Sequence, residues 1–182
     1  MTENQLNENR AAERGMLTGM FRDRESTENA YNTLYERGYT KDDINLIMSD
    51  ETRKKHFSGD FQETELGSKA AEGAGTGSAI GGTVGAIVGV IAAIGTSIAI
   101  PGLGIVLAGP IAAGLAGAGA GGITGGVIGA LVGSGIPEER AKLYETGINS
   151  GNIVMGVNPR NSEDAKYFEE NWRTNKGEEI RY

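Results

Sequence analysis

Residues 73–100, GAGTGSAIGGTVGAIVGVIAAIGTSIAI, open a stretch of 65 residues, 73–137, that contains no charged side chain. Glycine recurs there at every fourth position in two series, and this spacing puts each series on one stripe of an α-helix. A glycine inside a helix costs about 1 kcal/mol relative to alanine, a cost that the close approach of a second helix can offset. The stripes therefore predict helix packing and self-association through Gly73, Gly77, Gly81, Gly85, Gly89, Gly117, Gly121, Gly125, Gly129 and Gly133.

A cluster of helix-breaking residues separates the two glycine series. Pro101, Gly102 and Gly104 favour a tight turn between two antiparallel helices, over about 73–100 and 104–134. We therefore expect a glycine-zipper helical hairpin over residues 70–135. Aliphatic side chains surround both segments, and a helix that is apolar all round must be buried by lipid or by protein.

The sequence on either side of this stretch alternates between strand and helix patterns. Asp23 or Ser26 can cap the first helix, and Gly38 follows it where a left-handed glycine belongs. After the stretch, Pro137 can begin a helix, and Asn161 or Ser162 can cap the last one. The patterns predict strands over 16–21, 44–48, 152–157 and 179–182, and helices over about 25–37 and 137–149. They also predict a last helix whose inner face carries Ala165, Phe168 and Trp172.

Four strands paired with helices on one face predict an α+β fold, a ferredoxin-like sandwich interrupted by the antiparallel glycine-zipper hairpin. Neither flank alone offers enough apolar surface to fold well. We therefore expect residues 16–69 and 136–182 to form one ferredoxin-like domain together, with residues 1–15 as a polar tail and residues 70–135 as the hairpin.

Composition narrows the classes of function. The net charge is −7, and no long basic run is present, which argues against a nucleic-acid partner. The chain has no cysteine, so disulfides and thiolate metal sites are excluded. Its first residues are polar and do not suggest a secretory signal, so a cytoplasmic start is expected.

No group of residues predicts catalysis, a cofactor or a metal site. Residues 117–122 satisfy the pattern G-x-G-x-x-G of dinucleotide sites, but they fall inside a glycine-rich helix pattern, which favours packing. His56 is the only histidine and lies in a charged linker. The short basic run 53–55 and the paired carboxylates 42–43, 138–139 and 169–170 are typical of a solvated surface. The larger aromatic residues are expected in the core and at interfaces: Tyr144, Tyr167, Phe168 and Trp172.

Several motifs resemble the bacterial general stress proteins, also called heat-induced or low-temperature-induced stress proteins. The similarity begins with MLTGMFRD at 16–23 and continues through Ala30, Leu34 and the segments 38–39 and 42–44. It includes PGLG at 101–104, AGP at 108–110 and GALVGSGIPEE at 129–139, followed by Ala141, Tyr144 and Gly151. The resemblance implies an association with stress and no known chemistry.

Two main hypotheses of function follow, and neither involves an enzyme. In the first, the protein self-associates through its hairpin and is inserted in or attached to a lipid bilayer, on the cytoplasmic side of the bacterial inner membrane. In the second, it is a soluble, cytoplasmic structural homo-oligomer, a shell or a filament, whose hairpins bury one another. A small-ligand-binding regulatory domain is a third possibility. The first two predict that the protein's partner is another copy of itself.

Overall fold

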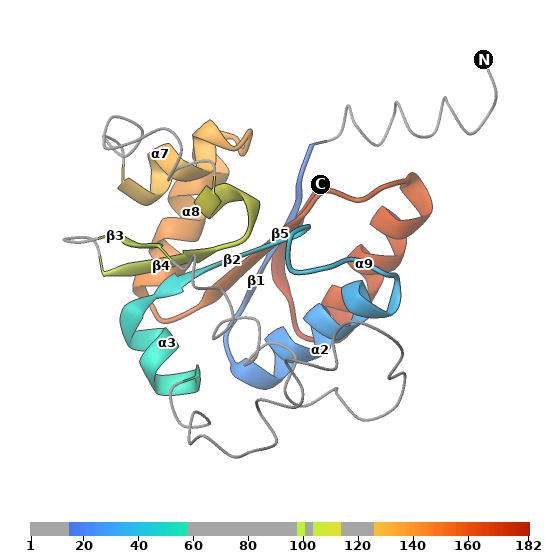
Figure 1. Cartoon of the computed structure of the whole chain (residues 1–182), viewed down its shortest axis with the longest axis horizontal. Coiled ribbons are helices and arrows are strands. Elements are labelled where there is room, and N and C mark those ends of the chain that lie inside the picture. The colour runs from blue at the N-terminus through green and yellow to red at the C-terminus, as the bar shows by residue number, and fades with distance from the viewer. Residues whose placement is uncertain (1–14, 58–97, 101–103, 114–125) are drawn as a thin grey trace.

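The apolar run that follows Gly15 forms the first strand, β1 (Leu17–Phe21), in which every residue is buried. The computed structural model describes residues 15–57, 98–100, 104–113 and 126–182. Within these ranges, six strands form one sheet with the order β3-β4-β2-β5-β1-β6, and all neighbouring strands are antiparallel. The prediction of a mixed α and β architecture is thus confirmed (Figure 1).

Strands from both flanks share this sheet. β5 (Ile153–Val157) lies between β1 and β2 (Ile44–Ser49) and pairs with each of them. On its other side β1 pairs with β6 (Glu178–Arg181), an edge strand of the described sheet. Residues 15–49 and 153–181 therefore build one sheet together.

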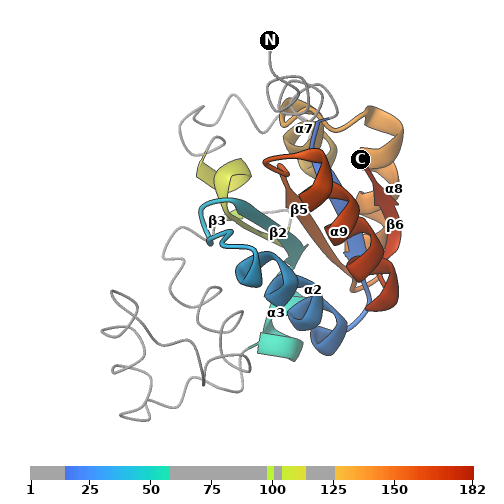
Figure 2. The same ribbon diagram turned by 90° about the vertical axis from the view of Figure 1, so that its right-hand side faces the viewer.

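One face of the sheet is covered by α2 (Arg24–Glu36) and α9 (Ser162–Thr174), which lie side by side (Figure 2). Asp23 caps α2 by accepting a hydrogen bond of 2.8 Å from the Ser26 amide. Asn161 caps α9 in the same way through the Asp164 amide, at 2.7 Å. The helices bury their apolar faces against the strands through Ala30, Tyr31, Leu34, Ala165, Phe168 and Trp172.

The opposite face is also covered, which corrects the expectation that helices lie on one face alone. α7 (Gly126–Gly133) and α8 (Glu138–Asn149) pack there, and Tyr144 and Leu131 join a second core with Ile47 and Val154. The physical reason is visible in the strands. All five residues of β1 and of β5 are buried, a pattern typical of strands that are covered on both faces.

The helical hairpin predicted over 70–135 is wrong at residues 98–100 and 105–108, which form strands in the structure. Residues around the turn form two antiparallel strands, β3 (Ile98–Ile100) and β4 (Ile105–Ala108), and β4 pairs with β2. Gly104 has φ +61° in this turn, and its carbonyl accepts a 2.7 Å hydrogen bond from the Asp50 amide. β-branched residues favour strands, and β2 supplies backbone groups for β4 to pair with. Pro101 and Gly102 lie outside the described residues.

After β4 the chain turns at Gly109, where φ is +94° and the backbone passes against β2. A Cβ atom at this position would lie 2.1 Å from the Ile44 carbonyl oxygen, so only glycine fits. The side chain of Asn45 then accepts a 2.8 Å hydrogen bond from the Ile111 amide. This bond fixes the short helical segment 110–113 to the same strand.

Four helices of the described chain end in the same way. In each, the second residue after the helix has a left-handed conformation, and its backbone amide donates a hydrogen bond to a carbonyl of the last turn. The amide of the next residue donates to a second carbonyl of that turn. The left-handed residue is a glycine at the ends of α2, α7 and α8. At the end of α9 it is a lysine. These four residues are Gly38, Gly135, Gly151 and Lys176.

Candidate functional site

The structure describes two of the ten glycines predicted to mediate self-association. Gly129 and Gly133 lie in α7, separated by one helical turn, as the spacing predicted. The other eight, and the pattern at 117–122, lie outside the described residues. The site can therefore be built from α7 and the helix on which it packs.

α7 has a buried side and a bare side. Val127, Ala130 and Leu131 are buried and join the core cluster that includes Tyr144 of α8, on which α7 packs. On the bare side, a Cβ atom added to Gly129 or to Gly133 would meet nothing within 4 Å. The described part of the chain therefore brings no close partner to these glycines.

Two exposed apolar side chains lie on the same pair of packed helices. Val132 in α7 is 43% exposed, and Leu143 in α8 is 40% exposed. α7 carries no charge, and its nearest ion pair in the sequence joins Glu138 to Lys142 on α8 at 2.6 Å. We use the name α7–α8 face for these four positions on the two packed helices: Gly129, Val132, Gly133 and Leu143. Chemically, such a face can exclude water against another apolar surface but offers no group for a reaction.

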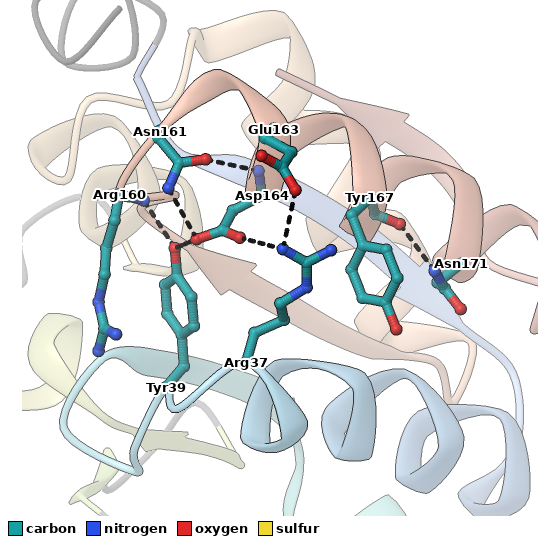
Figure 3. Close-up of polar contacts among 8 residues, drawn as sticks. All are labelled: Arg37, Tyr39, Arg160, Asn161, Glu163, Asp164, Tyr167 and Asn171. Carbon is teal, nitrogen blue, oxygen red and sulfur yellow. Dashed lines mark hydrogen bonds and ion pairs between the residues drawn. The ribbon is translucent and has the colours of Figure 1, made fainter. Parts of the chain in front are cut away.

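A polar network joins the end of α2 to the start of α9 (Figure 3). Asp164, which is only 7% exposed, lies at its centre. Its carboxylate accepts hydrogen bonds from the Tyr39 hydroxyl at 2.8 Å, from the Arg37 guanidinium at 3.1 Å and from the Asn161 amide at 3.2 Å. The Tyr39 hydroxyl in turn accepts a 2.6 Å bond from the Arg160 backbone N–H. Both carboxylate oxygens are thus engaged.

Two arginines extend this network over tyrosine rings. The Arg37 guanidinium lies 4.2 Å from the centre of the Tyr167 ring, and that of Arg160 lies 4.2 Å from the Tyr39 ring. Burial raises the pKa of Tyr39, so its hydroxyl stays protonated and can donate to Asp164. The arrangement docks the loop after α2 onto α9. The buried hydroxyl of Tyr39 and the carboxylate of Asp164 are engaged with each other, so the network links these two elements structurally.

Three of the remaining charged candidates, Arg53, Lys54 and Asp43, also have structural partners. Arg53 and Lys54 both bind the Asp50 carboxylate in α3 (Asp50–Phe57), at 2.7 and 2.6 Å, so that part of the basic run is neutralised. Partial burial opposes ionisation of Asp43, but the Thr40 amide and hydroxyl and the Arg160 guanidinium lower its pKa overall. Within the described ranges, no three acidic or histidine side chains gather as metal ligands would.

The aromatic residues are placed as the sequence predicted. Tyr144, Phe168 and Trp172 are fully buried, and Tyr167 is half-buried beneath Arg37. Tyr144 donates to the Thr18 hydroxyl at 2.8 Å or to the Glu179 carbonyl at 2.9 Å. These side chains hold the layers together and form no open stacking platform.

Comparison with known proteins does not assign the chain to a family. No protein-family model matches the chain, and no curated protein or solved structure is significantly similar to it. Among the helices that the structure describes, none has the length and apolar character needed to cross a lipid bilayer. Since the comparisons give no family, the functional hypothesis is built on the α7–α8 face.

Proposed function

We propose that this protein is a non-enzymatic, stress-associated protein that self-associates through its charge-free glycine-rich stretch. The observation that carries the proposal is the α7–α8 face, where no atom of the described chain lies beside Gly129 and Gly133 and where Val132 and Leu143 are exposed. A bare glycine stripe lets another backbone approach closely and gain dispersion contacts. The stress association rests on the sequence resemblance alone.

We also propose that the chain is built on a ferredoxin-like module. The support is the strand order β6-β1-β5-β2, with α2 and α9 on one face of those four strands. In this description everything between β2 and β5 is an insertion. β4 and β3 then extend the sheet, and α7 and α8 cover its second face.

The partner at the α7–α8 face is proposed to be a second copy of the chain. Replacing Gly133 by glutamate tests this, because a Cβ atom there meets no atom of the described chain within 4 Å and glutamate is a better helix former than glycine by about 0.5 kcal/mol. The domain should stay folded while the charge opposes burial of the face. Asn149→Glu, which adds the same charge at an exposed position of α8, is the matched control.

Light scattering coupled to gel filtration, in buffer without detergent, gives the result. We expect the wild type and Asn149→Glu to be oligomeric and Gly133→Glu to be smaller. An equal mass for all three variants would contradict a role for this face. A wild type that elutes as a monomer of 19.0 kDa would contradict self-association altogether.

Membrane attachment is the second candidate, favoured by the length of the stretch, 65 residues without charge. Flotation with vesicles of zwitterionic or anionic lipid distinguishes it from a soluble assembly. Protein that floats with both kinds of vesicle, and does so in high salt, supports attachment through apolar residues. Protein that stays at the bottom of the gradient with both supports the soluble oligomer.

A further inference from the structure

The junction between α9 and β6 stores backbone strain that the other helix ends avoid. Lys176 occupies the left-handed position with φ +61°, where the other three helix ends have Gly38, Gly135 and Gly151. A left-handed conformation is unfavourable for a residue with a Cβ atom, because that atom crowds the following carbonyl. In the described chain, Lys176 and Glu179 are the non-glycine residues with positive φ, and both belong to this junction or to the strand that follows it.

The junction is also too tight to relax locally. Residues 175–177 connect the last residue of α9 to the first of β6. A Cβ atom at Gly177 would lie 2.7 Å from the Trp172 carbonyl oxygen and 3.0 Å from the Phe21 ring. The Gly177 amide already bonds to that carbonyl at 2.7 Å. Glycine is therefore required at 177, and the lysine is left at the strained position beside it.

β6 is held less regularly than the strand on the other side of β1. β5 pairs with β1 at five consecutive positions. β6 pairs with β1 through Thr18 with Arg181 and Met20 with Glu178, and the register shifts between these two pairs. Glu179, within this irregular segment, has φ +49°. The ion pair of Glu178 with Arg22, at 2.7 Å, is exposed and contributes little to stability.

We propose that β6 exchanges between two copies of this chain. In the exchanged dimer, each β6 pairs with β1 of the other copy and makes the contacts that the closed monomer makes within itself. The junction at 175–177 opens into an extended connection, and Lys176 leaves the left-handed conformation. A short, strained connection favours such an exchange, because the strain is released while the contacts of β6 with β1 are kept. The backbone hydrogen bonds of Lys176 and Gly177 within the closed junction are replaced by bonds to water. This association uses neither the glycine stripes nor the α7–α8 face, so it goes beyond the proposed function.

The absence of cysteine from the natural sequence allows a direct test. One full-length chain carries Met20→Cys and a second carries Glu178→Cys, two positions that face each other in the register of β1 and β6. The two chains are unfolded together, refolded and oxidised. A disulfide between position 20 of one chain and position 178 of the other, identified by mass spectrometry, requires β6 of one chain to lie on β1 of the other. We expect a covalent dimer on a non-reducing gel.

Two controls keep this test decisive. Glu170→Cys, exposed on α9, replaces Glu178→Cys as an unmatched position and should give no disulfide to position 20. If Met20→Cys does not fold, the facing pair Thr18→Cys and Arg181→Cys replaces the first pair. A matched pair that gives no more covalent dimer than the unmatched pair overturns the proposal.

Variants of the junction test whether strain is the cause. Lys176→Gly accepts the left-handed conformation and should weaken exchange about fivefold for each junction, or roughly thirtyfold for the dimer. Lys176→Ala removes the same charge but keeps the Cβ atom, and should exchange like the wild type. Equal exchange by Lys176→Gly and Lys176→Ala would overturn the strain argument. The same cysteine pairs in the Gly133→Glu background should still link, because exchange does not use the α7–α8 face.

Discussion

Replacing Lys176 by glycine is expected to stabilise the closed fold. The left-handed conformation costs a residue with a Cβ atom about 1–2 kcal/mol, and glycine avoids this cost. Glycine also gives the unfolded chain more freedom, which opposes folding by about 0.5–1 kcal/mol. Lys176 is exposed, and its side chain makes no hydrogen bond to the described residues; its charge does act on Asp23, an effect that Lys176→Ala also removes. The net gain is therefore about 1 kcal/mol.

Thermal unfolding measures this gain. For a chain of this size, 1 kcal/mol raises the melting temperature by about 2–4 °C. The melt is followed by circular dichroism at a concentration low enough to keep the protein dissociated. Lys176→Ala is the control, and it should melt close to the wild type because it retains the Cβ atom.

The reciprocal change, Gly38→Ala at the end of α2, is expected to destabilise the fold. Gly38 has φ +76°, and a Cβ atom there has room, with the nearest atom 3.9 Å away. Gly38→Ala should therefore lose about 1 kcal/mol through its backbone conformation alone. The reasoning is refuted if Gly38→Ala lowers the melting temperature but Lys176→Gly leaves it unchanged or lowers it. The effects at the two positions would then not share one physical cause.

Three further predictions concern single contacts. Gly109→Ala should lower the free energy of unfolding, measured by chemical denaturation, by about 3 kcal/mol or more, because its Cβ atom would overlap the Ile44 carbonyl oxygen. The same change at Gly129, where a Cβ atom meets no atom of the described chain, should not destabilise the protein. Asp164→Ala should lose about 2–3 kcal/mol in urea titration by removing the charged acceptor of the network, and a loss below 1 kcal/mol would contradict its structural role. The hydrogen bond from the Ser26 amide lowers the pKa of Asp23 below 3.8, so its stabilising effect is present above that pH and is lost as the pH falls through the folded-state value. Asp23→Asn keeps the cap without titrating, so the fall in melting temperature between about pH 7 and pH 3 should be smaller than in the wild type.

The flanking elements could be predicted because their signals are local. Asp23 and Asn161 cap helices from the positions that the sequence indicated, and Gly38 and Gly151 end helices with positive φ. The run 17–21 is short and apolar and forms a strand. Each of these features depends on a few neighbouring residues, and the tertiary structure did not override them.

The β3–β4 pair could not be predicted from the same kind of signal. Glycine at every fourth position favours helix packing, while the β-branched residues between the glycines suit strands equally well. The free backbone groups of β2 decide the outcome at Ile105 and Val106, and that strand lies far away in the sequence. Of the predicted site, Gly104, Gly129 and Gly133 fall within the described residues, and the first of them turns between strands.

The polar network was missed for a related reason. Tyr39 and Asp164 are separated by 125 positions in the sequence, and no spacing rule connects them. The available hint was Tyr39 directly after Gly38, since an aromatic residue after a helix end often packs back onto the helix. That hint indicates that Tyr39 is buried, but it does not identify the acidic partner of its hydroxyl.

The position of β1 in the sheet has a consequence for how the chain folds as it is synthesised. β1 leaves the ribosome among the first elements, yet both of its partners, β5 and β6, belong to the last part of this sequence. At a synthesis rate of about 5–20 residues per second, both edges of β1 stay unpaired for roughly ten seconds before those partners are made. β2 and β4 are closer together and can pair earlier. The sheet therefore grows from β2 and β4 towards β6, and a chaperone that binds extended apolar segments would find Leu17–Phe21 exposed throughout that interval.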